Sequence, residues 1–289
     1  MQIRQVSLPL AILDPNQTVQ RDEDYLRPTA QCDAHAGEIL ALAQGLREGN
    51  DSDWIFASHL FDLVRNEILF MPAAPPAGGV VGTLERGYGI CVDKAHLLVA
   101  LARAGGMAAR YCIVGTRLSA MSEQAGGEAM PNAFRVALGF REARRLRPAG
   151  DEGEIHKRPH PRVELRIDGV WLPADPTLGD AEAAGMSLPL PRLGYDPFML
   201  WGSSGTVIER VEELAADHRR WIARRLFCTL ACRRGTCANA IMNESRAKGS
   251  YVLESEGVEA YLLRMKRFYM PLPVASALAD FSPLTEDAG

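Results

Sequence analysis

The sequence has no long hydrophobic run, no excess of charge of one sign and few cysteines. No stretch of 18 apolar residues occurs, so no transmembrane helix is predicted. The formal net charge of −4 is not typical of a protein that binds nucleic acid through its phosphates. Six cysteines in 289 residues are too few for a disulfide scaffold.

The N-terminal segment also lacks the pattern of a secretory signal. Its apolar stretch is short, is broken by a proline and is followed by acidic residues. Hydrophobic residues make up 47% and charged residues 24% of the chain, the balance of a soluble globular protein. We therefore expect a cytoplasmic protein that binds neither nucleic acid nor a membrane.

Hydrophobic periodicity predicts helices over 34–48, 53–70 and 91–105, and a long helix over 207–234 with two shorter ones after it. Strands are expected over 109–118 and 132–140, and one or two more within residues 1–30. Residues 119–132 and 147–159 are loops by composition. This mixture predicts an α+β protein.

Cys91 stands at the start of the predicted helix 91–105, directly after the glycine-rich sequence GYGI. The unpaired N–H groups and the positive dipole end of a helix N-terminus favour an anion. Such an environment lowers the pKa of a thiol and offers donors to an oxyanion. A cysteine that only packs in the core would fit the same position, so the position alone leaves both interpretations open.

A base and a group that orients it follow in residues 160–177. Asp168-Gly169 between two apolar runs is a strong signal for a β-hairpin. This turn pairs Ile167 with Val170, Leu165 with Leu172 and Val163 with Ala174. His160 and Asp175 then become diagonal neighbours on one face, within reach of each other. His156 is a rival base in the preceding loop; we prefer His160 because a strand holds a side chain more firmly.

Two motifs resemble the transglutaminase-like superfamily of cysteine enzymes. GICVDKAHLLVALARAGGMAAR, residues 89–110, is similar to its nucleophile helix, and HPRVELRIDGVWLPADPT, residues 160–177, is similar to its His-x-x-Val-Glu strand with the Trp and Asp-Pro-Thr that follow. The order Cys, His, Asp also agrees, and the resemblance covers about residues 55–180. Pro161, Arg162 and the pair Met107-Ala108 depart from the usual family residues.

The resemblance implies a papain-like fold, in which a helical part with the cysteine packs against an antiparallel sheet with the histidine and aspartate. The catalytic core would be residues 1–184, and 185–289 would form a helical C-terminal extension of unknown role. Cys91 would be the nucleophile, His160 the base and Asp175 the orienting group, with no cofactor and no metal. Trp54, Tyr88 and Glu164 are further candidates for holding the oxyanion or the substrate.

The reaction predicted from these residues is acyl transfer from an amide or thioester to an amine, which forms an amide bond, or to water. A cluster of arginines could dock an acidic carrier protein that bears the thioester, although a solvated helix face explains it as well. It comprises Arg219, Arg220, Arg224, Arg225, Arg233 and Arg234. The alternatives are a hydrolase, a coenzyme A-dependent N-acyltransferase and an inactive protein-interaction scaffold. The segment CTLACRRGTC, residues 228–237, lacks the Cys-x-x-Cys spacing of a zinc site.

Overall fold

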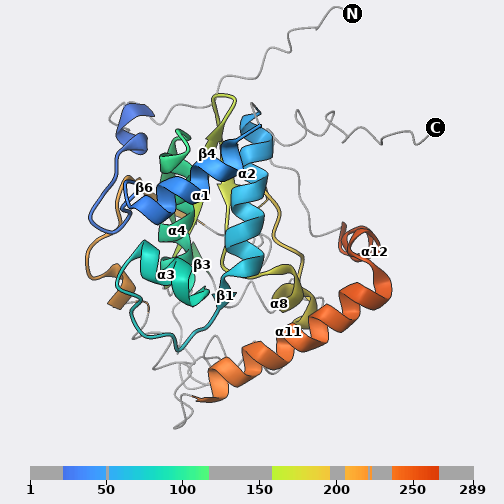
Figure 1. Ribbon diagram of the computed structural model, residues 1–289. Coiled ribbons are helices and arrows are strands. Elements are labelled where there is room, and N and C mark those ends of the chain that lie inside the picture. Colours follow the sequence, from blue (N-terminus) through green and yellow to red (C-terminus); the bar gives the residue numbers. More distant parts are fainter. Residues whose placement is uncertain are drawn as a thin grey trace, which may run out of the picture.

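The computed structural model describes residues 22–49, 52–116, 158–195, 206–220, 222 and 236–266. Within these ranges helices and one antiparallel sheet form the fold, which confirms the predicted α+β class. Figure 1 shows the helices that precede the sheet strands gathered around α4, and a separate pair of helices, α11 and α12, at the C-terminal end. No helix in the described part of the chain is both long and apolar enough to cross a membrane.

The cysteine-bearing helix α4 (Cys91–Ala104) is the centre of the main core. All of its residues from Cys91 to Arg103 are buried, as expected of a helix that is covered on every side. Three shorter helices pack around it: α1 (Gly37–Arg47), α2 (Asp53–Asp62) and α3 (Val80–Arg86). A π-helical segment, η2 (Leu63–Glu67), extends α2. The short parallel pair β1 (Leu69–Phe70) and β2 (Tyr88–Gly89) leads into α4.

The sheet has four antiparallel strands in the order β5-β4-β3-β6. They are β3 (Ala109–Thr116), β4 (Arg158–Ile167), β5 (Val170–Ala174) and β6 (Thr206–Val211). The hairpin between β4 and β5 has the three predicted residue pairs. Its turn residues Asp168 and Gly169 have φ angles of 49° and 80°, the positive values that a two-residue turn of type I′ requires.

The C-terminal part of the chain differs from the prediction. Residues 206–211 form β6, which pairs with β3, although the sequence predicted a helix over 207–234. Val207, Val211 and Leu214 follow helical spacing, but pairing with a sheet edge overrides that local preference. Because β6 completes the sheet, the predicted boundary at residue 184 cuts through the fold, and the extension is not wholly helical.

A second hydrophobic core lies between α8 (Asp180–Gly185), α11 (Thr236–Glu256) and α12 (Val258–Arg264). Helices α8 and α11 cross at two glycines. A Cβ atom added to Gly185 would overlap the backbone of Ser245, and one added to Gly249 would overlap the backbone of Ala181. The extension is therefore packed against residues that follow the predicted catalytic hairpin.

The other differences concern local structure. Residues Asp22–Leu26 form a 3-10 helix, where the sequence predicted strands within 1–30. The predicted loops within 119–157, the strand over 132–140 and the rival base His156 lie outside the described residues, as do Cys228 and Cys232.

Candidate active site

Cys91 is the first residue of α4, and its surroundings explain the glycines that precede it. Gly87 ends α3 with a φ of 69°, a left-handed conformation that glycine adopts without strain. A Cβ on Gly89 would lie 2.7 Å from the Cβ of Asp93, too close for two carbon atoms. The Asp93 carboxylate accepts a hydrogen bond of 3.1 Å from the backbone N–H of Ile90. The Asp93 side chain thus closes the turn that carries Cys91, as in a helix cap.

His160 and Asp175 are brought together by the hairpin of β4 and β5. The Nε2 atom of His160 lies 2.8 Å from Oδ2 of Asp175. The other carboxylate oxygen, Oδ1, accepts a hydrogen bond of 3.0 Å from the backbone N–H of Thr177. Asp175 is only 1% exposed, so both of its oxygens are fixed in a nearly dry environment.

Cys91 completes this arrangement on the other side of His160. Burial lowers the pKa of His160, but the Asp175 carboxylate and hydrogen bonds with Asp175 and Cys91 raise it to about 10. Burial likewise raises the pKa of Asp175, but the His160 charge and hydrogen bonds with His160 and Thr177 lower it overall. The structure therefore favours an imidazolium at neutral pH, placed between a thiol and a carboxylate.

Glu164 lies on the same face of β4 as His160 but has a different set of partners. Its carboxylate forms ion pairs of 2.8–3.0 Å with Arg110, Arg162 and Arg210. Burial raises its pKa, but these three guanidinium groups lower it to about 2. The side chain is 5% exposed, so the described contacts make Glu164 the centre of an ion-pair cluster. A role in holding the substrate stays a prediction.

Trp54 is not brought to Cys91. It lies in the first turn of α2 and is 39% exposed. Phe56, in the same turn, contacts the backbone at Gly105, just beyond the C-terminal end of α4. Cys91 lies at the opposite end of α4, about 20 Å away along a helix of 14 residues. The predicted oxyanion role of Trp54 is therefore wrong: α2 and α4 run antiparallel, which the sequence alone does not specify.

Tyr88 lies on β2, three residues before Cys91, and is half-buried. The guanidinium carbon of Arg86 lies 4.8 Å from the centroid of its ring. The ring also packs against the main core. These contacts place Tyr88 near the head of α4 as a packing residue, and its role toward a substrate stays a prediction.

The segment that follows β6 also reaches the head of α4, which the sequence did not indicate. The guanidinium group of Arg219 bonds both carboxylate oxygens of Asp93, at 2.5 and 2.8 Å, and the backbone oxygen of Pro75 at 3.0 Å. The adjacent His218 has its pKa lowered by burial and by the positive charge of His160. Arg219 is thus tied to α4; Arg220 is exposed, and the other four arginines of the predicted docking face lie outside the described residues.

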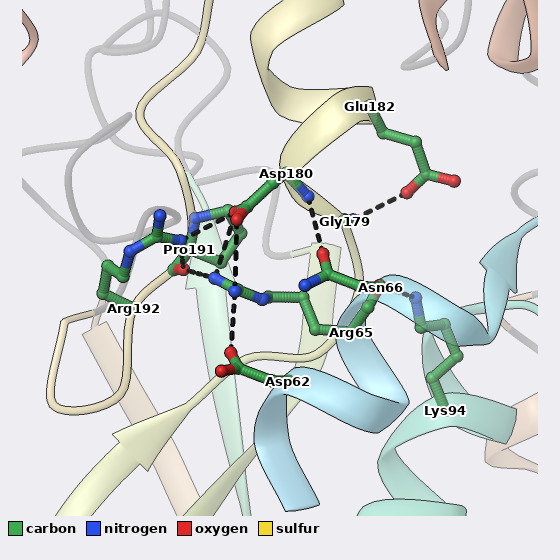
Figure 2. A network of polar contacts seen from close by, with 9 residues as sticks. All are labelled: Asp62, Arg65, Asn66, Lys94, Gly179, Asp180, Glu182, Pro191 and Arg192. Atoms are coloured by element: carbon green, nitrogen blue, oxygen red, sulfur yellow. Dashed lines mark hydrogen bonds and ion pairs between the residues drawn. The ribbon is translucent and has the colours of Figure 1, made fainter. Parts of the chain in front are cut away.

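A buried polar network lies behind the site and was also missed (Figure 2). Asp93 and Lys94 stand at the start of α4, where charged side chains are ordinarily solvated, yet they are 4% and 0% exposed. Lys94 donates a hydrogen bond of 3.1 Å to the backbone oxygen of Arg65 in η2. A charged pair near a predicted nucleophile is the one signal in the sequence that could have marked them, and it is a weak one.

The comparison with protein families agrees with the motifs. Residues 40–176 match the model of the Transglutaminase-like superfamily, and this span contains Cys91, His160 and Asp175. Among solved structures, the chain is similar to a candidate cysteine protease from Cytophaga hutchinsonii, with 16% identity and a TM-score of 0.38. The match covers 71% of this chain and 56% of that one, so it spans little more than half of that protein. No curated protein sequence matches this chain. Residues 40–176 are therefore similar to the transglutaminase-like superfamily.

Proposed function

We propose that this protein catalyses cysteine-dependent acyl transfer from an amide or thioester, with an amine as the preferred acceptor. The observation that carries the proposal is the position of His160, which is bonded to Asp175 and interacts with Cys91 at the head of α4. Nucleophile, base and orienting group in this arrangement are the requirements of covalent acyl transfer.

In the first half of the reaction, the Sγ atom of Cys91 attacks the carbonyl carbon of the donor as a thiolate. The carbonyl oxygen becomes an oxyanion, which the free backbone N–H groups of the first turn of α4 can stabilise. The His160 imidazolium donates its proton to the leaving group as the bond to that group breaks. The products are a thioester on Cys91, a neutral His160 and the free leaving group.

In the second half, the acceptor attacks the thioester carbon and gives a proton to His160. The bond between carbon and Sγ breaks, the Cys91 thiolate leaves, and the ion pair with His160 is restored. Asp175 stabilises the imidazolium and holds the ring so that Nε2 faces the carboxylate. The Thr177 N–H in turn fixes the carboxylate.

Burial of the site limits hydrolysis of the proposed thioester, which leaves an amine as the preferred acceptor in this proposal. Cys91 is 5% and His160 is 9% exposed, so little bulk water reaches the position of the thioester. Exclusion of water protects a reactive intermediate from hydrolysis. Hydrolysis is the second outcome, since water competes wherever the acceptor site is empty. A carrier protein as the source of the thioester stays a prediction.

The experiment is a two-step kinetic assay with p-nitrophenyl acetate as donor and glycine ethyl ester as acceptor. We expect a burst of p-nitrophenolate in proportion to enzyme, an acetyl group on Cys91 by intact mass and peptide mapping, and faster release when the amine is added. Cys91→Ala should show neither burst nor adduct. No adduct on Cys91 in the wild type would contradict the proposal, and release that is insensitive to the amine would favour the hydrolase.

A further inference from the structure

Lys94 is a buried cationic residue beside the site that the proposed mechanism does not use. It is 0% exposed, and a buried lysine is costly unless it is paired or hydrogen-bonded. Its Nζ atom donates a hydrogen bond of 3.1 Å to the backbone oxygen of Arg65. Figure 2 shows this bond at the edge of the polar network, where the lysine reaches from α4 to the π-helical segment.

The position of Lys94 on α4 relates it directly to Cys91. Residues three apart on a helix lie on the same face, one turn from each other. Lys94 is therefore one turn below the nucleophile. The ammonium group interacts with the Asp175 carboxylate, and the same turn of the helix carries Cys91.

Four charged groups face Lys94 from the elements packed around it. Glu182 of α8 and Asp175 attract the ammonium group, whereas Arg246 of α11 and Arg65 of η2 repel it. Burial is the largest effect and lowers the pKa of Lys94 to about 8, against the attraction of the two carboxylates. Lys94 consequently carries most of its charge at neutral pH.

The partners of Lys94 are themselves anchored to the segment after Asp175. Arg65 forms ion pairs with Asp62, at 2.7 Å, and with Asp180, at 3.1 Å. The side-chain oxygen of the neighbouring Asn66 accepts a hydrogen bond of 3.0 Å from the backbone N–H of Asp180. Glu182 accepts hydrogen bonds from the backbone N–H groups of Gly179, at 2.7 Å, and Phe70, at 3.1 Å, and pairs with Arg246 at 2.5 Å. The lysine thus connects α4 to the stretch that begins four residues after Asp175.

We infer that Lys94 is a positioning residue: its buried ammonium group fixes the turn that bears Cys91 against the segment that bears Asp175. This inference rests on the proposed function. The cation has a second effect, because a positive charge near Asp175 opposes the hold of that carboxylate on the His160 proton. Lys94 thereby helps His160 to release its proton to the leaving group.

The test uses two substitutions and a matched control. Lys94→Gln removes the charge and keeps a donor for the Arg65 carbonyl, whereas Lys94→Met removes both and keeps the length. Lys248→Gln, at an exposed site of α11, is the control. The readouts are the rate constant of the p-nitrophenolate burst, its dependence on the concentration of p-nitrophenyl acetate, and the His160 titration by ¹⁵N NMR, with the signal assigned by its loss in His160→Gln.

In Lys94→Gln we expect the rate constant of the p-nitrophenolate burst, which reports acylation of Cys91, to fall about tenfold with little change in its dependence on donor concentration. The His160 titration should move to higher pH by roughly one unit, since a nearby cation is lost. A merely structural disturbance would move it the opposite way, toward the ordinary value of a histidine. The rate constant of the burst should fall further in Lys94→Met, and in Lys248→Gln it should match that of the wild type.

An unchanged or lowered His160 titration in Lys94→Gln would overturn the inference, as would a wild-type rate constant of the burst. If Lys94→Met does not fold, Lys94→Gln carries the test alone. Failure of the proposed function is distinguishable, because it would appear as the absence of an acetyl adduct on wild-type Cys91. The His160 titration is read without substrate and still reports on the charge of Lys94 in that case.

Discussion

Two buried carboxylates, Glu164 on β4 and Asp175 directly after β5, lie on one hairpin and have opposite kinds of partner. Glu164 is surrounded by three guanidinium groups, which carry their charge at every accessible pH. Asp175 is paired with one imidazole, whose charge can come and go. Both have a lowered pKa, so the direction of the shift does not separate them. The two carboxylates differ in whether the charge of the partner is permanent or can change.

The difference indicates which region is built for chemistry. A carboxylate among permanent cations can hold strands together but has no proton to exchange with them. A carboxylate on a histidine that also interacts with a thiol can support proton transfer. Asp175 lies two residues after Pro173, the residue opposite Glu164 on the hairpin, which makes the two carboxylates a natural pair for comparative substitution.

The largest effect on activity is expected at the pair formed by His160 and Asp175. His160→Ala removes the imidazole that interacts with both Cys91 and Asp175, and should lower kcat with p-nitrophenyl acetate by at least about a thousandfold. His35→Ala, at an exposed position, should have no effect. A loss below tenfold in His160→Ala would show that Asp175 and Glu164 do not differ as we describe.

Glu164→Gln should act on stability instead. It leaves three arginines, two of them nearly buried, without their carboxylate, and breaking such a group costs about 3 kcal/mol of unfolding free energy. Glu209→Gln on the exposed side of β6 should cost less than about 0.5 kcal/mol. Urea unfolding measures both. Acylation of Cys91 should persist in folded Glu164→Gln, and its loss would place Glu164 in the site.

Glu164 and His160 should each determine the pH dependence of stability on one side of neutral pH. The pKa of Glu164 is lowered from 4.5 to about 2, so its contribution is present above pH 4.5 and is lost as the pH falls toward 2. The pKa of His160 is raised from 6.5 to about 10, so its contribution is present below pH 6.5 and is lost as the pH rises toward 10.

Thermal unfolding over this pH range should therefore show two separate changes. Glu164→Gln should flatten the acid side of the stability curve, and His160→Ala the alkaline side. The same flattening in both variants would mean that the two clusters titrate as one.

The smallest effects are expected away from both carboxylates, at two helical glycines. Gly249→Ala places a Cβ against the backbone of α8 and should cost about 1–3 kcal/mol. Gly45→Ala in α1 meets nothing within 4 Å and should stabilise the protein by about 0.5–1 kcal/mol. Opposite signs in urea unfolding would confirm that α8 and α11 pack as described. Equal signs would contradict that packing.

The sequence predicted the parts of the site that depend on local structure. Asp168-Gly169 specifies a two-residue turn, and the alternation of side chains then fixes the register that joins His160 to Asp175. The small and leucine-rich pattern after Cys91 specifies α4. Both features are encoded within about 20 residues, so neither requires knowledge of distant contacts.

The parts that were missed depend on contacts between distant segments. Lys94 is buried because η2 and α8 cover it, and its sequence neighbours give no sign of that. Trp54 is at the wrong end of α2 because of the way in which two helices pack. Residues 206–211 are a strand because the edge of β3 is open to them, although their own spacing favours a helix.

The most direct test of the central claim is alkylation by iodoacetamide at about pH 6.5, where an ordinary thiol is almost entirely protonated. Intact mass and peptide mapping would compare the wild type with His160→Ala. Cys32 and Cys112 are internal controls, since burial raises their pKa values to about 12 and about 11. We predict that Cys91 is modified much faster than Cys32 and Cys112 in the wild type, and slowly in His160→Ala. If Cys91 reacts no faster than Cys32 and Cys112 in either protein, it is not an activated nucleophile, and the account of this site as catalytic is wrong.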